Sequence, residues 1–100
     1  MNKQFEGKVA FISGGTSGLG KATVYELVKR GARVIFVGRD DAKAQEVINK
    51  CKELGGEAEY KNCDITKHQN VIDVFGYILE RYGKLDFAGN VAGTDSLHPN

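Results

Sequence analysis

The feature that most constrains the fold is a regular alternation between short apolar segments and amphipathic helical segments. Apolar runs of strand length lie at residues 8–13, 34–37, 57–61 and 85–89. Between them, apolar residues recur at the spacing of a helix. This order of strand, helix, strand predicts parallel strands joined by right-handed crossovers, with helices on both faces of one sheet. The run at 34–37 is continuous, as in a strand covered on both faces, whereas 57–61 is more polar and suits an edge.

Local signals mark where the first two helices begin and end. The first follows Gly18 and stops at Gly31, a residue type that favours the position after a helix C-terminus. The second begins with Asp40 or Asp41 as N-cap and stops at Gly55. We expect the sheet-facing residues of the first helix to be Leu19, Ala22, Thr23 and Leu27.

The third helix is expected to open with a capping box. Thr66 would be the N-cap and Gln69 the reciprocal partner at the third helical position. The helix would stop at Gly83. Its inward stripe would consist of Val71, Ile72, Phe75, Ile78, Leu79 and Tyr82.

The composition excludes several classes of protein. Fourteen basic and thirteen acidic residues give a net charge of +1, which provides no electrostatic case for nucleic acid or an anionic membrane surface. The sequence contains no apolar run of about 18 residues, so it predicts no transmembrane helix. It has no apolar segment near the N-terminus, so it predicts no secretory signal. Two cysteines make no disulfide framework, so we expect a reducing, cytoplasmic setting. Residues 1–100 read as a single domain.

A glycine-rich turn, Ser13-Gly14-Gly15-Thr16-Ser17-Gly18-Leu19-Gly20, joins the first expected strand to the first helix. In open α/β sheets ligands bind at the carboxyl ends of strands, where this turn lies. Glycines allow the backbone to approach a pyrophosphate, and the helix N-terminus offers N–H groups and a positive dipole end. The hydroxyls of Thr16 and Ser17 would add donors. The alternative is a tight strand–helix turn with no ligand.

The glycine spacing is G-x-x-x-G-x-G, which differs from both the G-x-G-x-x-G fingerprint and the P-loop. It resembles the cofactor turn of the short-chain dehydrogenase/reductase family, Thr-Gly-x-x-x-Gly-x-Gly, with Ser13 in place of the threonine. Cys63-Asp64-Ile65 resembles the family's aspartate motif after the third strand. Asn90-Val91-Ala92-Gly93 resembles its Asn-Asn-Ala-Gly motif after the fourth, with Val91 departing from the pattern.

The resemblance implies an α/β fold: a Rossmann-like doubly wound parallel sheet, truncated to four strands in order 3-2-1-4, with three helices. Residues 1–100 would then be part of an NAD(P)-binding domain. It also implies that Asp64 accepts a hydrogen bond from the adenine amino group. Asn90 would help to hold the sheet, and Ala92 and Gly93 would border the cofactor ribose.

The residues after the second strand favour NADP(H). An NAD site normally carries an acidic residue there to accept from the ribose 2′-hydroxyl, but this chain has Gly38. Arg39 follows and offers a charged planar fork to a 2′-phosphate. In the alternative, NAD(H) binds, Asp40 contacts the ribose and Arg39 is a solvated loop residue. The expected cofactor-binding residues are Ser13, Gly14, Thr16, Ser17, Gly18, Leu19, Gly20, Arg39, Asp64, Ile65, Asn90, Ala92 and Gly93.

The function implied is that of an NADP(H)-dependent oxidoreductase moving hydride between the cofactor and a small carbonyl or alcohol. The family's catalytic Ser and Tyr-x-x-x-Lys belong to elements after the fourth strand, where this chain ends, so we assign no catalytic residue. Tyr25 and Lys29 match that spacing, but on the first helix and, by our expectation, facing away from the sheet. The alternative function is a truncated, catalytically inactive nucleotide-binding fragment.

Two further expectations concern metals and partners. His68 and His98 are not spaced with the cysteines or carboxylates as zinc ligands would be, so we expect no metal site. The fourth strand would lie at a sheet edge and expose unpaired backbone. We therefore expect self-association of the chain through that strand.

Overall fold

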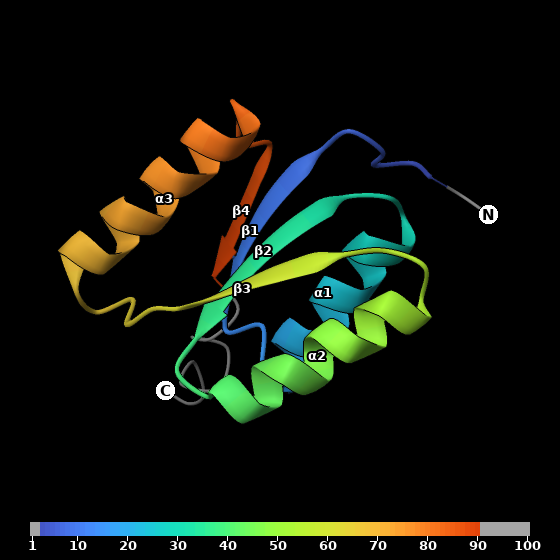
Figure 1. Cartoon of the computed structure of the whole chain (residues 1–100), viewed down its shortest axis with the longest axis horizontal. Coiled ribbons are helices and arrows are strands. Elements are labelled where there is room, and N and C mark those ends of the chain that lie inside the picture. Colours follow the sequence, from blue (N-terminus) through green and yellow to red (C-terminus); the bar gives the residue numbers. More distant parts are fainter. Residues whose placement is uncertain (1–2, 91–100) are drawn as a thin grey trace, which may run out of the picture.

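The computed structural model describes residues 3–90. They form one parallel sheet in the order β3-β2-β1-β4, which confirms the expected doubly wound topology. Helices α1 and α2 cover one face of the sheet and α3 covers the other (Figure 1). The elements are β1 (Val9–Ser13), α1 (Gly18–Lys29), β2 (Arg33–Gly38), α2 (Asp41–Glu53), β3 (Ala58–Asn62), α3 (His68–Tyr82) and β4 (Phe87–Asn90).

The core consists of two apolar clusters, one on each face of the sheet. Strands β1 and β2 lie in the middle and are buried on both faces, because successive side chains alternate between them. Their contributions toward α1 and α2 are Ala10, Ile12, Val34 and Phe36. Their contributions toward α3 are Val9, Phe11, Ile35 and Val37.

Most helix boundaries follow the capping signals. The Asp40 side chain accepts a hydrogen bond from the Lys43 amide at 3.0 Å, so Asp40 is the N-cap of α2. Gly31, Gly55 and Gly83 follow or cap the three helix ends with φ of +95°, +88° and +77°. These left-handed conformations strain any residue with a β-carbon, which explains glycine at each stop.

The expected capping box of the third helix is wrong. Helix α3 begins at His68, and Lys67 occupies its N-cap position without a side-chain hydrogen bond. Thr66 instead donates from its hydroxyl, at 2.6 Å, and from its amide, at 3.0 Å, to Oδ1 of Asp64. A carboxylate is a stronger acceptor than the neutral alternatives, so Thr66 folds back on the preceding loop.

The rotation of α1 about its axis differs from expectation, and two residues of the expected α3 stripe stay exposed. Leu19, Ile72 and Leu79, expected to face inward, are 57%, 46% and 54% exposed. Helix α1 buries Val24 and Val28, one position from the expected face, which corresponds to a turn of about 100°. Of the expected residues, Ala22 is exposed and Leu27 packs at the edge of the core cluster. In α3 the other expected residues, Val71, Phe75, Ile78 and Tyr82, do pack against the core. The apolar stripe of α3 is wider than its contact with the sheet, so residues at the edges of the stripe stay exposed.

Strand β4 begins at Phe87 rather than at Leu85. The reason is a pairing between Asp86 and Val9 at the start of β1. The Asp86 amide donates to the Val9 carbonyl, and the Val9 amide donates to Oδ2 of Asp86, each at 2.8 Å. A side-chain oxygen thus replaces a backbone carbonyl at this point, and the regular ladder starts one residue later.

Candidate functional site

Three loops meet at the carboxyl ends of the strands, as the sequence predicts. They are the glycine-rich turn after β1, the Arg39 loop after β2 and the Asp64 loop after β3. Together they line a cavity of about 230 Å³, whose walls include Gly14, Arg39, Asp64 and Ile65. Ile65 also borders a second cavity of about 210 Å³, lined by Phe11, Ser13, Val71 and Asn90 as well.

The glycine-rich turn packs directly on β2. Gly14 has φ of +77° and its amide donates to the Val37 carbonyl at 3.1 Å. The Ser17 amide and hydroxyl both donate back to the Gly14 carbonyl, at 3.3 and 3.2 Å. A β-carbon on Gly15 would lie 2.7 Å from Cβ of Phe36, so only glycine fits there without displacement. The backbone therefore lies in close contact with the central sheet.

The N-terminus of α1 faces the site without a side-chain cap. Ser17 is the N-cap residue but makes no capping hydrogen bond, and the first turn holds no acidic residue. A β-carbon on Gly18 would meet nothing within 4 Å, so open space adjoins this turn. Unpaired N–H groups at the positive end of a helix dipole are suited to an anion such as a phosphate.

Ser13 and Asn90 join β1 to β4 beneath the turn. The Ser13 hydroxyl, only 2% exposed, donates to Oδ1 of Asn90 at 2.8 Å. This bond lies within the sheet, in keeping with the sheet-holding role that the resemblance implies for Asn90. Ala92 and Gly93, the other expected residues of this motif, lie outside the described residues.

Asp64 and Arg39 face each other across the first cavity. Nη1 of Arg39 lies 2.9 Å from Oδ2 of Asp64, and the arginine side chain is 67% exposed. Hydrogen bonds from Thr66 hold the pKa of Asp64 below its usual value, and the nearby Arg39 adds to this. Asp64 is therefore an ionised acceptor at neutral pH.

Sequence reasoning missed a second polar group, behind the Arg39 loop. Tyr60 and Asn62 lie two positions apart on β3, and both hydrogen-bond to Oδ1 of Asp41. The period of two along a strand places them on one face. That spacing was a usable signal, but their shared partner comes from another element.

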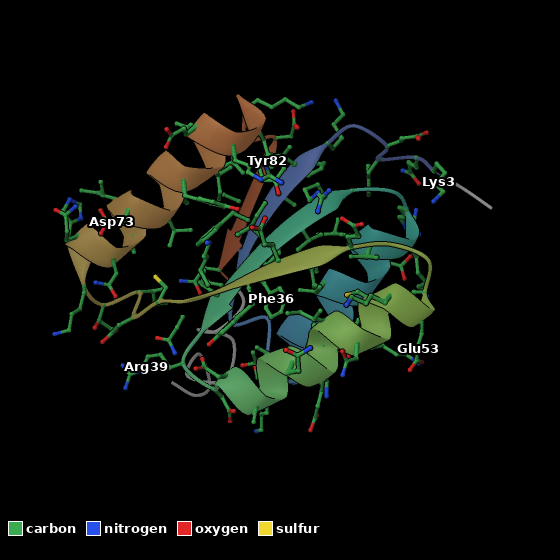
Figure 2. All side chains as sticks on the ribbon, viewed as in Figure 1. Lys3, Phe36, Arg39, Glu53, Asp73 and Tyr82 are labelled. Carbon is green, nitrogen blue, oxygen red and sulfur yellow. The ribbon has the colours of Figure 1, made fainter. Side chains whose placement is uncertain are left out.

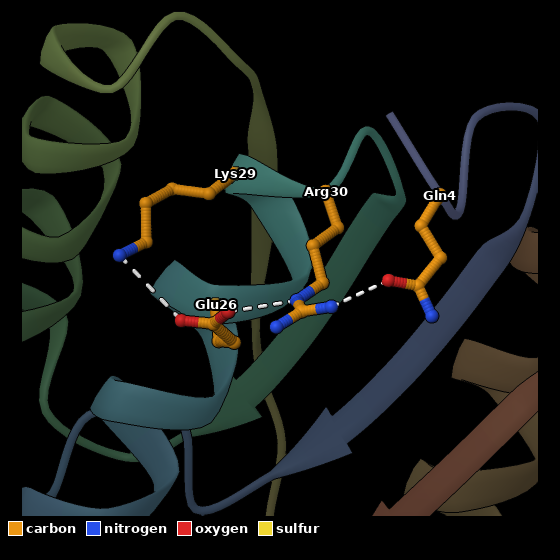
Figure 3. Close-up of polar contacts among 4 residues, drawn as sticks. All are labelled: Gln4, Glu26, Lys29 and Arg30. Carbon is orange, nitrogen blue, oxygen red and sulfur yellow. Dashed lines mark hydrogen bonds and ion pairs between the residues drawn. The ribbon is translucent and has the colours of Figure 1, made fainter. Parts of the chain in front are cut away.

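The Tyr-x-x-x-Lys match on α1 has no place in this site. Figure 3 shows Lys29 directed to Glu26, with Nζ 3.5 Å from Oε1, while Arg30 binds the other oxygen at 2.7 Å. Tyr25, expected to point away from the sheet, is partly buried and packs against the core cluster. Burial first, and then acidic groups of α2, raise the pKa of Tyr25. Neither residue lines a cavity at the strand carboxyl ends.

A larger hollow, of about 630 Å³, lies at the opposite end of the strands, near the start of β3 and the end of α3. Figure 2 shows Arg39 beside the start of α2 and Tyr82 at the other end of the molecule. Several polar groups of this hollow are already paired with each other. Arg33 pairs with Glu57 at 2.8 Å, and Glu59 accepts from Tyr82 at 2.6 Å. The glycine-rich end is the better candidate.

Within residues 3–90, no helix has the length and apolar character needed to cross a membrane. In the same residues, no three side chains of the His, Cys, Asp or Glu type gather as metal ligands.

Comparison with known proteins gives a consistent result. The family model of the short chain dehydrogenases matches residues 8–100. The chain is 39% identical over 90 residues to a 3beta-hydroxysteroid dehydrogenase of Mediterraneibacter gnavus, covering 90% of this chain and 33% of that protein. Over 92 residues it is 39% identical to tropinone reductase-like 1 of Erythroxylum coca, covering 92% and 33%.

Solved structures show the same likeness. A hydroxysteroid dehydrogenase from Escherichia coli superposes with a TM-score of 0.82 at 30% identity, covering 89% of this chain and 38% of that one. A metagenomic short-chain oxidoreductase in complex with NADP has a TM-score of 0.81 at 31% identity; the match covers 84% of this chain and 38% of that one. An NAD+-bound xylitol dehydrogenase has a TM-score of 0.79 at 27% identity, with 85% of this chain and 33% of that one covered. The chain spans about a third of the length of the curated relatives it matches. This chain belongs to the short-chain dehydrogenase family.

Proposed function

We propose that the chain is the nucleotide-binding part of an NADP(H)-dependent oxidoreductase, which moves hydride between the cofactor and a small carbonyl or alcohol. Among its structural relatives one holds NADP and another NAD+, so membership of the family leaves the choice to individual residues. The bound nicotinamide ring supplies the hydride chemistry. The chain's own contribution is binding and orientation.

The observation that carries the proposal is the arrangement at the end of β2. Gly38 presents no carboxylate to repel a 2′-phosphate. The Asp40 carboxylate caps α2 by accepting from Lys43, which argues against the reading in which it serves the ribose. Arg39 stands between them with an exposed guanidinium. An exposed guanidinium beside Gly38, where no carboxylate would repel a 2′-phosphate, favours a phosphate monoester.

The other two loops would hold the remaining parts of the nucleotide. The uncapped N-terminus of α1, with open space at Gly18, suits the pyrophosphate. Asp64 would accept from the adenine amino group. In the free chain Oδ2 of Asp64 pairs with Arg39, so we infer that binding exchanges partners: Arg39 turns to the 2′-phosphate and Asp64 to the adenine. Solvent-exposed ion pairs contribute little to stability, so breaking this pair on binding costs little free energy.

Calorimetric titration of the chain with NADP+ and NAD+ tests the proposal. We expect NADP+ to bind at least tenfold more tightly, since hydrogen bonds to charged groups contribute about 1.5–3 kcal/mol. Arg39→Ala should remove this preference. Lys52→Ala, which deletes a positive charge at the far end of α2, is the matched control and should keep it. Equal affinity of the unaltered chain for the two cofactors would refute the NADP(H) assignment.

A second candidate is a nucleotide-binding module without turnover of its own. It is supported by the position of the one Tyr-x-x-x-Lys match in residues 1–100. This match lies on α1, away from the candidate site, and its lysine pairs with Glu26 instead of facing a cofactor. Reading the coding sequence past residue 100 discriminates the two. A downstream serine and Tyr-x-x-x-Lys in frame would favour the enzyme, and a stop codon would favour the module.

We also propose that the chain associates with itself through β4. Within the part of the chain that the structure describes, β4 pairs with β1 alone, and Phe87 is 38% exposed. An edge with exposed apolar side chains favours pairing with another chain. Sedimentation should show dimers or larger species, and a monodisperse monomer would contradict this.

The cysteines support a reducing, cytoplasmic location. Cys51 and Cys63 are both buried free thiols, at 0% and 2% exposure, on opposite faces of the sheet. Such residues act as small apolar groups and need no oxidising compartment. Cell fractionation would test the location directly.

A further inference from the structure

The loop that carries Arg39 is braced from behind by β3. The Tyr60 hydroxyl lies 2.8 Å from Oδ1 of Asp41 and 3.0 Å from the carbonyl oxygen of Gly38. Nδ2 of Asn62 donates to the same Asp41 oxygen at 2.8 Å. Gly38 ends β2 and Asp41 begins α2. The single proton of the phenol is therefore shared between acceptors at the two ends of the short connection that holds Arg39.

These contacts of Tyr60 and Asn62 with Asp41 and Gly38, called the brace below, are both rigid and charged. The Tyr60 ring stacks at an angle on the buried Phe36, with 5.3 Å between ring centroids, which fixes the direction of its hydroxyl. Burial, aided by Asp41, raises the pKa of Tyr60 to about 12, so the phenol keeps its proton. The bonds from Asn62 and Tyr60 lower the pKa of Asp41, which is therefore a carboxylate. A neutral donor on a charged acceptor makes a strong hydrogen bond.

The brace also controls where a negative charge lies. Asp41 is two positions after Arg39, and its carboxylate is fixed toward β3 by its two donors. Without them the carboxylate would be free to pair with Arg39 or to repel a nearby phosphate. Both effects would weaken a 2′-phosphorylated nucleotide, whereas a nucleotide with a free 2′-hydroxyl carries no charge at that point.

We propose that Tyr60, with Asn62, is a positioning residue that sets the selectivity of this site for a 2′-phosphorylated adenine dinucleotide. It acts through the Arg39 loop and the direction of the Asp41 carboxylate. The inference rests on the NADP(H) site proposed above.

The test is Tyr60→Phe, which deletes the hydroxyl and keeps the ring on Phe36. Calorimetric titration should show that NADP+ binds about five- to tenfold more weakly, roughly 1 kcal/mol, because the Asp41 carboxylate is no longer held away from the Arg39 loop. NAD+ affinity should stay within about twofold. The matched control is Tyr77→Phe, which also removes a phenol bound to a carboxylate, that of Glu59, on the other face of the sheet. It should leave both affinities unchanged.

Two further measurements separate positioning from general damage. In an Asp41→Ala background, Tyr60→Phe should cause a smaller loss of NADP+ affinity than in the unaltered chain, because only the contact with the Gly38 carbonyl remains. Without any ligand, amide hydrogen exchange at Arg39 and Asp40 should be faster in Tyr60→Phe than in Tyr77→Phe. Equal losses for NADP+ and NAD+, or unchanged exchange at the loop, would overturn the inference. If the unaltered chain binds neither nucleotide, the proposed function fails, and the exchange comparison still decides whether the brace exists.

Discussion

Two glycines of the same turn should respond to alanine in opposite ways. On Gly15 a β-carbon would lie 2.7 Å from Cβ and 2.8 Å from Cδ2 of Phe36. Phe36 is fully buried and its Cβ is tied to the backbone of β2, so the contact cannot be relieved by turning a flexible tip. On Gly18 a β-carbon would meet nothing within 4 Å. The first position therefore serves packing, and the second leaves space for a ligand.

The expected changes in Tm and in NADP+ affinity follow from this contrast between the two positions. Overpacking of a core costs about 1–3 kcal/mol, and in a domain of this size that lowers Tm by roughly 5–20 °C for Gly15→Ala. Gly18→Ala should leave Tm unchanged or raise it slightly, since Gly18 is the first residue of α1 and a β-carbon there meets no other atom. A clash of 1–3 kcal/mol with the bound pyrophosphate would weaken NADP+ binding by roughly 5- to 150-fold.

Thermal unfolding followed by far-ultraviolet circular dichroism, with calorimetric titration of NADP+, measures both effects. Each variant is the control of the other, because the substitution is the same and the positions are three residues apart. The reasoning is refuted if Gly15→Ala unfolds at the temperature of the unaltered chain. It is equally refuted if Gly18→Ala is the less stable variant, or binds NADP+ as well as the unaltered chain does.

Three other outcomes can be measured. Ser13→Ala removes the bond to Asn90 and should lower the free energy of unfolding by about 1 kcal/mol, whereas Ser13→Thr should retain most of it. Neither cysteine should react with Ellman's reagent in the folded chain at pH 8, since burial raises the pKa of Cys51 to about 11; rapid labelling would contradict this. Thr66 lowers the pKa of Asp64, so the stabilisation from its carboxylate is complete above the ordinary pKa and lost as pH falls through the lowered one. Tm should stay level from pH 7 to about 5 and fall below about pH 4.

The sheet could be predicted from sequence because its signals are local and redundant. The apolar runs that form β1 and β2 are continuous; Gly14 follows the first and Gly38 ends the second. Asp40 caps α2, as its residue type suggests. Parallel order then follows from the alternation of strands and helices. The three loops of the site come together for the same reason, since all of them follow strand carboxyl ends.

The errors concern choices that the surrounding structure makes. Leu19 and Val24 are both apolar, and only contact with the sheet decides which of them is buried. Thr66 has the residue type of an N-cap and stands just before α3, but its hydroxyl donates to the Asp64 carboxylate two residues earlier instead. The brace of Tyr60 on Asp41 joins residues 19 positions apart. Periodicity describes one element at a time and carries no information on such pairings.

The Asp64 loop has a consequence for the kinetics of binding. Its conformation is fixed before any ligand arrives: the Cys63 amide donates to Gly38, the Asp64 amide to Asn70 and the Lys67 amide to Asp64. A nucleotide that docks there has little chain to order, so the association rate should be similar for phosphorylated and unphosphorylated cofactors. Discrimination between them then lies in how long each stays bound, and stopped-flow measurements should find the difference in the dissociation rate.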